Sequence, residues 1–270
     1  MIKVLGLLTC FNRKDKTVRA LKKLIQGNPG IDFSFIVADD ASPDGTAQAL
    51  KGFKEVTVLS GNGSLFYSGG MRVAIAEAKK TEDEFDYCLL FNDDVDFAER
   101  SIEELCLKDI SAIWVGPTSD ENGTLSYGGV VKTSKWRPKT EIIMGKSSQG
   151  SICDTFNANC VLIPWGIFKE LDNIDSVYTH SMGDFDYGFS AVKKGYEIRV
   201  SDKFVGICPD NPVQASWRNT ELSFKERVRR KESPKGLPTK EWFHYLNKNY
   251  NAVTAIVYSL IPYFRIILKK

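Results

Sequence analysis

Three acidic clusters are the residues of this chain best suited to chemistry, and they occur at residues 38–45, 91–96 and 183–187. Carboxylates are costly to remove from water, so a group of them beyond a run of apolar residues needs a compensating partner. A divalent metal, the hydroxyls of a ligand, or hydrogen bonds from a bound base or sugar would serve. The clusters therefore predict a site for a polar ligand that carries a metal.

Asp39, Asp40 and Asp44 belong to the first cluster, which follows an apolar run. The Ser-Pro-Asp-Gly sequence at 42–45 is typical of a turn that begins a helix, and Asp44 is predicted to cap that helix. Asp39 or Asp40 is then available to accept hydrogen bonds from a nucleobase N–H or from ribose hydroxyls. We therefore predict that this turn binds the nucleoside part of a ligand.

The second cluster contains Asn92, Asp93 and Asp94 directly after another apolar run. Mg²⁺ and Mn²⁺ prefer oxygen ligands, often one or two carboxylates together with the phosphates of a ligand. Asp94 is therefore the predicted metal ligand, with Asp96 as a second candidate or a supporting residue. Asn92 would contact a ribose or a metal-bound water. A solvated strand end is the alternative interpretation.

A predicted helix begins at the third cluster, and Asp184 and Asp186 lie in its first turn. A carboxylate at a helix N-terminus is stabilised as the anion, so Asp184 could act as a base. Asp186 lies two residues further on, points elsewhere around the helix, and could bind an acceptor hydroxyl. Capping of the helix by one of the two is the alternative. His180 precedes them, and a lone histidine favours a structural hydrogen bond over a metal role.

Residues 9–13 and 61–72 add polar groups near predicted strand ends. A hydroxyl, an aromatic ring, an amide and a guanidinium in the first segment suit a base, a ribose or a diphosphate, although an ordinary loop could contain them. In the second segment Gly69 and Gly70 precede a predicted helix, where backbone N–H groups can approach phosphate and Arg72 adds donors. Neither a P-loop nor a G-x-G-x-x-G after the first strand is present, which argues against a nicotinamide enzyme.

The elements that must position these residues alternate in the first half of the chain. Short links between strands and helices predict a parallel, doubly wound α/β sheet, in which ligands bind beyond the carboxyl ends of the strands. Residues 1–115 are thus expected to form a Rossmann-like nucleotide half. The predicted strands are 2–8, 33–38, 56–59 and 87–91, and the predicted helices are 16–26, capped by Asp15, 45–53 and 70–80.

The alternation changes after about residue 115, and a mixed half at 116–224 is expected to shape an acceptor pocket. Together the two halves would form one domain, 1–224. The shorter strands are predicted at 110–115, 124–131, 141–144, 155–163, 196–200 and 204–207, with helices ending at 171 and spanning 183–194.

The last segment, 225–270, is a basic and aromatic helical tail. It carries eleven Lys and Arg and three Glu, a net charge of +8. Because the whole chain has a net charge of +2, residues 1–224 carry −6 (2 − 8). This overall charge argues against a general nucleic-acid binder. The apolar run at 252–261 is interrupted by Pro262 and is shorter than the roughly 20 residues of a spanning helix. It predicts either a helix lying in a bilayer surface, or one packed on the body or on a second subunit in a homodimer.

Six cysteines without a C-x-x-C pair predict buried thiols in a reducing compartment. The apolar run after Met1 is too short for a spanning helix and lacks a cleavage site, so it favours a first strand. We therefore expect a cytoplasmic protein, held peripherally at the inner face of the cell membrane.

Taken in order, these motifs resemble the inverting glycosyltransferases of family 2, which have the GT-A fold. The resemblance runs from residue 2 to about residue 207, and its motifs are at 9–13, 37–46, 69–72, 91–94 and 183–186. It implies a nucleoside-diphosphate sugar as donor, Mg²⁺ or Mn²⁺ on a D-x-D motif, and a catalytic Asp in an E-D motif. Asn92 replaces the first Asp of D-x-D, which leaves Asp94 as the metal ligand, and Gly183 replaces the Glu of E-D, with Asp184 retained.

The family resemblance implies a role for each candidate residue. Asp184 would take the proton from an acceptor hydroxyl, while metal at Asp94, secondarily Asp96, stabilises the departing nucleoside diphosphate. The acceptor would contact Asp186, Trp165 and His180. The nucleotide-sugar-binding residues would be Thr9, Phe11, Asn12, Arg13, Asp39, Asp40, Asn62, Gly70, Met71, Arg72, Asn92 and Asp93.

The G-D-x-D-Y sequence at 183–187, with Gly-Gly-Met-Arg at 69–72, resembles bacterial surface-polysaccharide members of the family, including rhamnosyltransferase-like ones. Their role in O-antigen or capsule synthesis implies a glycan or lipid-linked oligosaccharide as acceptor. Two alternatives are a non-catalytic sugar-nucleotide or glycan-binding module on the same fold and a sugar-nucleotide nucleotidyltransferase. The latter would be expected to open with a Gly-rich loop carrying Arg and Lys, which residues 9–13 lack.

Overall fold

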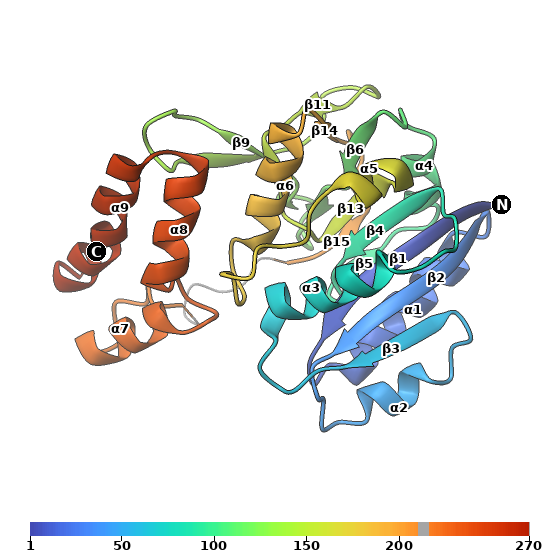
Figure 1. The fold of residues 1–270 in the computed structure, drawn as a ribbon, viewed down its shortest axis with the longest axis horizontal. Coiled ribbons are helices and arrows are strands. Elements are labelled where there is room, and N and C mark those ends of the chain that lie inside the picture. Colours follow the sequence, from blue (N-terminus) through green and yellow to red (C-terminus); the bar gives the residue numbers. More distant parts are fainter. Residues whose placement is uncertain (210–215, 270) are drawn as a thin grey trace.

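A mostly parallel eight-stranded sheet forms the centre of the computed structural model, which describes residues 1–209 and 216–269 (Figure 1). Its strands are β1 (Ile2–Cys10), β2 (Ile31–Asp39), β3 (Val56–Ser60), β4 (Tyr87–Phe91), β6 (Ala112–Val115), β11 (Ser151–Ile152), β13 (Cys160–Pro164) and β14 (Glu197–Val200). They lie in the order β11-β14-β6-β13-β4-β1-β2-β3. The predicted α/β fold is confirmed.

The first four strands are parallel neighbours, and helices connect them as predicted. Cys10 pairs with Asp39, and Asp39 pairs with Ser60, so the carboxyl ends of β1, β2 and β3 lie level with one another. Side chains that follow these strands therefore gather at one edge of the sheet. The connecting helices are α1 (Lys14–Gly27), α2 (Thr46–Leu50) and α3 (Phe66–Ala78).

Both faces of this sheet are covered, because successive residues of a strand point to opposite sides. Leu5 and Leu7 of β1 pack in the same core as Met71 of α3. Val4 and Leu8 of β1 pack in a second core that contains Leu21 and Leu24 of α1. The continuous apolar run at the start of the chain is explained by this burial on both sides.

The second half of the chain extends the sheet with mixed strand directions. β13 is antiparallel to both β4 and β6, whereas β14 is parallel to β6. Two small sheets lie beside it, one of β9 (Gly129–Lys132), β10 (Thr140–Ile143) and β12 (Thr155–Phe156), the other of β5 (Asp96–Phe97), β7 (Thr118–Ser119), β8 (Leu125–Tyr127) and β15 (Gly206–Ile207). The helices of this half are α4 (Ser101–Cys106), α5 (Trp165–Glu170) and α6 (Gly183–Lys193).

Several predicted boundaries were wrong. The strand predicted at 124–131 is two strands, β8 and β9, and the strand predicted at 155–163 is also two, β12 and β13; the members of each pair belong to different sheets. Helix α3 begins at Phe66 rather than at residue 70, so the paired glycines lie inside it. Asp15 lies within the first turn of α1, and the first backbone N–H of that helix, at Lys14, donates instead to Asp44 at 2.9 Å.

Gly70 allows α3 to lie close against β1. A Cβ added at Gly70 would sit 2.0 Å from the Thr9 Oγ1 atom, whereas one added at Gly166 of α5 would meet no atom within 4 Å. We expect Gly70→Ala to destabilise the fold by about 1–3 kcal/mol through overpacking, and Gly166→Ala to stay within about 0.5 kcal/mol. Urea unfolding of both variants measures this, and equal midpoints would contradict the close approach.

The C-terminal helices α7 (Phe224–Glu232), α8 (Thr239–Asn249) and α9 (Ala252–Ile267) lie together at one end of the molecule, beside α6 (Figure 1). Tyr245 and Leu246 of α8 belong to the same core as Phe189 of α6, so α8 packs on the body. The basic residues Arg227 and Lys231 of α7 are buried.

Pro262 lies inside α9, although the sequence predicted an interruption there. A proline lacks the N–H that would bond to the carbonyl four residues earlier. The indole N–H of Trp242 in α8 donates to that carbonyl, at Tyr258, over 3.1 Å. The helix therefore continues because a neighbouring helix supplies the missing donor.

All six cysteines lie among the described residues, where each is buried and none forms a disulfide. This confirms the prediction of buried thiols. No helix in the described ranges is long and apolar enough to cross a membrane.

Candidate active site

Arg13 joins two carboxylates that follow β4. Its Nη1 atom lies 2.9 Å from Asp93 Oδ1 and 3.0 Å from Asp94 Oδ2. Asp93 is buried, and its second oxygen accepts a hydrogen bond from Thr17 Oγ1 at 2.8 Å. The Asp94 side chain is 34% exposed, so it remains accessible to a ligand while Asp93 serves to hold Arg13. The structure thus brings the predicted 9–13 and 91–96 segments together.

Asp184 lies at the start of α6, and backbone N–H groups hold both of its oxygens. Phe185 donates to Oδ1 at 2.9 Å, and Ala158 donates to Oδ2 at 3.3 Å. Burial raises the pKa of Asp184 above the ordinary value, and these two amides offset part of that effect. A carboxylate with a raised pKa is a stronger base than an exposed one.

Tyr67 connects the Asp94 and Asp184 sites. Burial raises the pKa of its phenol well above the usual value, and the negative charges of Asp184 and Asp94 raise it further. Both carboxylates are therefore within electrostatic reach of this one side chain.

The start of β13 provides a second connection between the two carboxylates. The backbone carbonyl of Asn159 accepts the backbone N–H of Asn92 at 3.2 Å. The side-chain nitrogen of Asn159, Nδ2, lies 3.3 Å from Cys208 Sγ. That sulfur lies 3.7 Å from Asp94 Oδ1. Ala158 donates to Asp184, and its neighbour Asn159 contacts Asn92 and Cys208 near Asp94. These two adjacent residues therefore connect the two carboxylates.

His180 lies in the same neighbourhood with a neutral ring. Its Nδ1 atom accepts the backbone N–H of Tyr67 at 3.4 Å. Burial, together with the positive charges of Lys235 and Arg13, lowers the pKa of His180 to about 4. The imidazole is therefore neutral near pH 7, and a positive charge from the C-terminal segment lies close to the site.

Asp40 organises the loop before α3. Its two buried oxygens accept three backbone hydrogen bonds, from Gly63 at 2.8 Å, Leu65 at 2.9 Å and Phe66 at 3.1 Å. The Asp39 carboxylate accepts from the Ser42 hydroxyl through Oδ1, and Ser42 in turn accepts from the Asn12 N–H at 2.8 Å. Asp40 therefore stabilises the loop before α3, and Asp39 is the better candidate of the two to bind a ligand.

Strained backbone is concentrated in the loops of this site. Asn12, Ala41, Phe66 and Met182 have positive φ values of 54°, 59°, 53° and 67°. Only two further non-glycine residues among those described have positive φ. Residues other than glycine rarely adopt this conformation, and it persists where the surrounding structure enforces it, often at functional sites.

A metal at this site would depend on few protein ligands. No group of three or more His, Cys, Asp or Glu that could hold a metal occurs within 1–209 and 216–269. Asp94 offers one accessible carboxylate, and Mg²⁺ is often bound by one or two carboxylates plus the phosphates of a substrate. Asp96 forms ion pairs with Arg19, at 2.9 Å, and with Lys23, both on α1. The residues present therefore fit a cation held by Asp94 together with a diphosphate.

Several predicted site residues have other surroundings. Gly70 and Met71 are buried within α3, and Arg72 donates to the backbone oxygens of Asp175 and Tyr178 at 3.0 and 2.9 Å. Trp165 is 5% exposed, stacks on Phe168, and follows Pro164, which pairs with the first residue of β4. It therefore lies at the opposite end of β4 from Asp94, and we do not retain it in the site.

Asp186 connects α6 to α8. Its oxygens lie 2.7 Å from Lys248 Nζ and 2.8 Å from Asn249 Nδ2, and the side chain is buried. Of the other predicted residues, Thr9 lies in β1 and donates to Ala38 O at 3.1 Å. Phe11 and Asn62 lie in loops, where Phe11 is 51% exposed and Asn62 accepts from Ser64.

The sequence did not identify Tyr67, Asn159 or Lys235 as members of the site. Tyr67 precedes the glycine pair that was singled out. Asn157 and Asn159 form a polar break within an apolar stretch, which is a signal for a turn between strands. Lys235 follows the predicted body, and no local pattern indicates its position.

Residues 7–111 match the model of the family described as Glycosyl transferase family 2. No curated protein matches the chain. Among solved structures, a mannosyltransferase, PcManGT from Pyrobaculum calidifontis, in complex with GDP-Man and Mn²⁺, aligns with a TM-score of 0.53 over 98% of this chain and 73% of its own. TarS residues 1–349 from S. aureus, in complex with UDP-GlcNAc, align with a TM-score of 0.59 over 98% and 90%. Both are 13% identical to this chain, so these likenesses concern the fold.

Proposed function

We propose that this protein, whose residues 7–111 match the model of glycosyl transferase family 2, transfers a sugar from a nucleoside-diphosphate sugar to a hydroxyl of an acceptor, with inversion at the anomeric carbon. The observation that carries the proposal is the chain of contacts that joins Asp94 and Asp184. The backbone N–H of Ala158 donates to Asp184, and the adjacent Asn159 lies 3.3 Å from Cys208 Sγ, which lies 3.7 Å from Asp94 Oδ1. One carboxylate follows β4 and the other begins α6. A donor between them would have its diphosphate near Asp94 and its sugar near Asp184.

Asp184 is the proposed general base. Each of its oxygens accepts one backbone hydrogen bond and keeps a lone pair for an acceptor hydroxyl. As the proton moves to Asp184, the acceptor oxygen bonds to the anomeric carbon, and the bond from that carbon to the diphosphate oxygen breaks. The raised pKa of Asp184 favours this proton transfer.

Arg13 and Asp94 are proposed to hold the leaving diphosphate. Mg²⁺ or Mn²⁺, when bound by Asp94, would neutralise charge that develops on the diphosphate. The guanidinium of Arg13 lies beside Asp94 and is 44% exposed, so it can donate to phosphate oxygens as well. Asp39, with Phe11 and Asn12, is proposed to contact the nucleoside. The complexes of the two structural relatives, with GDP-Man and Mn²⁺ and with UDP-GlcNAc, support this type of donor.

We also propose a lipid-linked glycan as acceptor, a role in bacterial surface polysaccharide synthesis, and a peripheral place on the inner face of the cell membrane. The support is the resemblance of residues 69–72 and 183–187 to rhamnosyltransferase-like family members. The half-buried His180, whose Nδ1 atom accepts the Tyr67 N–H, is a candidate contact for the acceptor because its neutral ring can accept or donate a hydrogen bond.

A thermal-shift screen of UDP-, GDP-, dTDP- and CDP-sugars, each with and without Mn²⁺, tests the proposed function. A donor present at 100 times its Kd should stabilise the protein by about 2.7 kcal/mol, which corresponds to a rise in Tm of several degrees. We expect one nucleotide class to raise Tm, and more strongly with Mn²⁺. No shift with any of the four would contradict a nucleotide-sugar site.

A further inference from the structure

Helix α9 is apolar on two opposite sides. One side, with Ala255, Pro262 and Ile266, is buried against the other helices. The other side is exposed, and its residues recur at the three- and four-residue spacing of a single helix face. This exposed face consists of Val253 (72% exposed), Ile256 (58%), Val257 (48%), Leu260 (52%), Phe264 (57%), Ile267 (60%) and Leu268 (62%).

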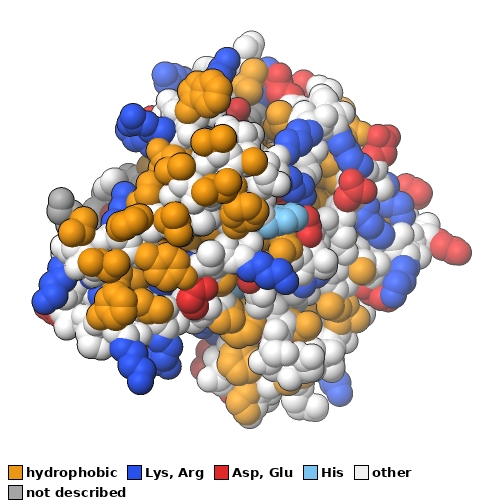
Figure 2. Space-filling view, turned by 60° about the vertical axis from the view of Figure 1, so that its left-hand side comes forward, with side chains coloured by type: hydrophobic (Ala, Val, Ile, Leu, Met, Phe, Trp, Pro, Cys, Tyr) orange, Lys and Arg blue, Asp and Glu red, His pale blue; other side chains and the backbone are white. Residues whose placement is uncertain are grey.

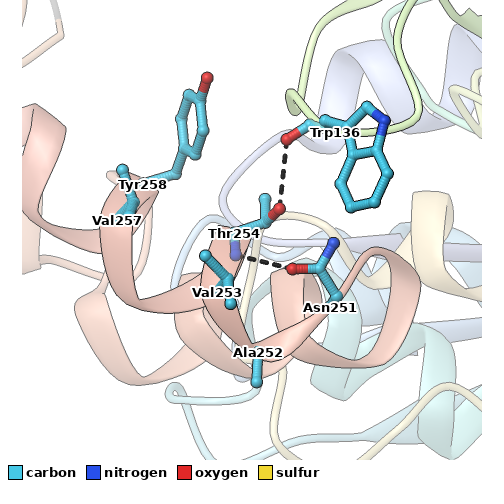
Figure 3. Close-up of a pocket in the computed structure, with 7 residues that line it drawn as sticks. All are labelled: Trp136, Asn251, Ala252, Val253, Thr254, Val257 and Tyr258. Carbon is cyan, nitrogen blue, oxygen red and sulfur yellow. Dashed lines mark hydrogen bonds between the residues drawn. The ribbon is translucent and has the colours of Figure 1, made fainter.

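A hairpin from the body extends this apolar face. Trp136, between β9 and β10, is 75% exposed, and its carbonyl accepts a hydrogen bond from Thr254 Oγ1 of α9 at 3.1 Å. Figure 3 shows Trp136 across a pocket from Val253 and Val257. The pocket has a volume of about 560 Å³. We refer to these seven exposed residues, six in α9 and Leu268 at its C-cap, together with Trp136 as the α9 face.

The surroundings of the α9 face are positively charged. Figure 2 shows the apolar side chains gathered on one surface, with several Lys and Arg side chains and fewer Asp and Glu side chains along the edge. Of the three Glu of these helices, Glu226 is paired with Arg229 and Arg230, the exposed Glu232 is paired with Lys231, and Glu241 is buried. The exposed basic residues of the three helices and the hairpin include Lys135, Arg137, Lys139, Lys225, Arg229, Lys240, Arg265 and Lys269.

We propose that the α9 face binds the surface of an anionic lipid bilayer, with α9 lying flat in the interface. Its sixteen residues span roughly 24 Å, less than the hydrocarbon thickness of about 30 Å. An exposed apolar stripe with tryptophan and surrounding basic residues is typical of helices that bind in the plane of a membrane. A second copy would instead place two basic edges against each other, which is electrostatically unfavourable.

Membrane binding would act on the site through α8. Glu241 accepts the backbone N–H of Thr179 at 3.2 Å, and Lys248 pairs with Asp186 at 2.7 Å. These contacts connect the C-terminal helices to both sides of Asp184. If the proposed function is correct, a bilayer under the α9 face would fix the orientation of Asp184 relative to a lipid-linked acceptor.

Vesicle flotation tests the proposal, with the double variant Leu260→Glu and Phe264→Glu and the matched control Leu107→Glu. All three positions are exposed, and Leu107, at 81%, lies outside the α9 face. We expect the wild type to float with vesicles of phosphatidylcholine and phosphatidylglycerol. The double variant should partition on the order of tenfold less, because it places charge in the apolar interface, and Leu107→Glu should match the wild type.

Three results would overturn the proposal. The wild type could remain with the soluble fraction, the double variant could float equally well, or Leu107→Glu could lose as much binding. If the wild type does not float but is a dimer by analytical ultracentrifugation, and the double variant is a monomer, the α9 face joins two copies instead. Flotation needs no turnover, so Asp184→Asn should float like the wild type even if the proposed function fails.

Discussion

Asp184→Asn is expected to lower kcat by about 10²–10⁴-fold and to leave donor affinity close to that of the wild type. Asparagine has nearly the same shape but cannot take a proton from an acceptor hydroxyl. The donor diphosphate is proposed to lie near Asp94 and Arg13, so its binding does not depend on this base. Steady-state transfer assays measure kcat, and the thermal shift with donor measures affinity and shows that the variant is folded.

The pH dependence of kcat provides a control for this assignment. The base must be ionised, so wild-type kcat should rise with pH through the pKa of Asp184 and level off above it. Because burial raises that pKa, the rise should occur above the ordinary range of an exposed aspartate. The residual rate of Asp184→Asn should lack this rise. A variant that keeps more than a tenth of wild-type turnover would exclude Asp184 as the base.

Asp94→Ala is expected to remove the additional stabilisation that Mn²⁺ gives to the donor complex and to lower kcat by roughly 10²–10³-fold. The alanine variant loses the one accessible carboxylate that the site offers to a cation. Arg13 keeps its ion pair with Asp93, so the loop should stay in place. Donor melting shifts with and without Mn²⁺ provide the measurement.

Asp96→Ala is the matched comparison for Asp94→Ala. The Asp96 carboxylate pairs with Arg19 and Lys23 on α1, so we expect the Mn²⁺-dependent shift to survive its removal. Equal losses in the two variants would assign Asp96 to the metal as well. An unchanged Mn²⁺ effect in Asp94→Ala would contradict the proposed metal position.

The nucleotide half was predictable from the sequence because its geometry follows from local rules. Strands buried on both faces read as continuous apolar runs, and short links between strands and helices require parallel strands. Parallel strands place their carboxyl ends at the same edge of the sheet. Arg13 and Asp94, which follow two of these strands, therefore lie close together. Asp184 was placed at a helix N-terminus by the same local reasoning.

Other assignments depended on contacts that no local pattern contains. Asp39 and Asp40 are adjacent and chemically identical, yet only Asp40 is surrounded by the N–H groups of Gly63, Leu65 and Phe66. Asp186 contacts a helix about sixty residues further along the chain. Such long-range contacts decide whether a carboxylate is available to a ligand.

The basic composition of the tail, 225–270, predicted its exposed positive charge only in part. Lys231 is fully buried, with its ammonium 4.3 Å from the centre of the Tyr263 ring and close to Glu232 and Thr239. Arg227 donates to the Trp217 carbonyl at 3.0 Å. Part of the basic composition therefore holds the three helices together, and only the exposed remainder can attract an anionic surface.

The most direct measurement is a crystal structure with the donor that gives the largest thermal shift and with Mn²⁺, located by its anomalous scattering. We predict Mn²⁺ at about 2.1 Å from an Asp94 oxygen. The anomeric carbon should lie between the diphosphate and Asp184, with the Asp184 carboxylate on the face opposite the leaving group. Manganese bound away from Asp94, or a sugar directed away from Asp184, would contradict inverting transfer at this site.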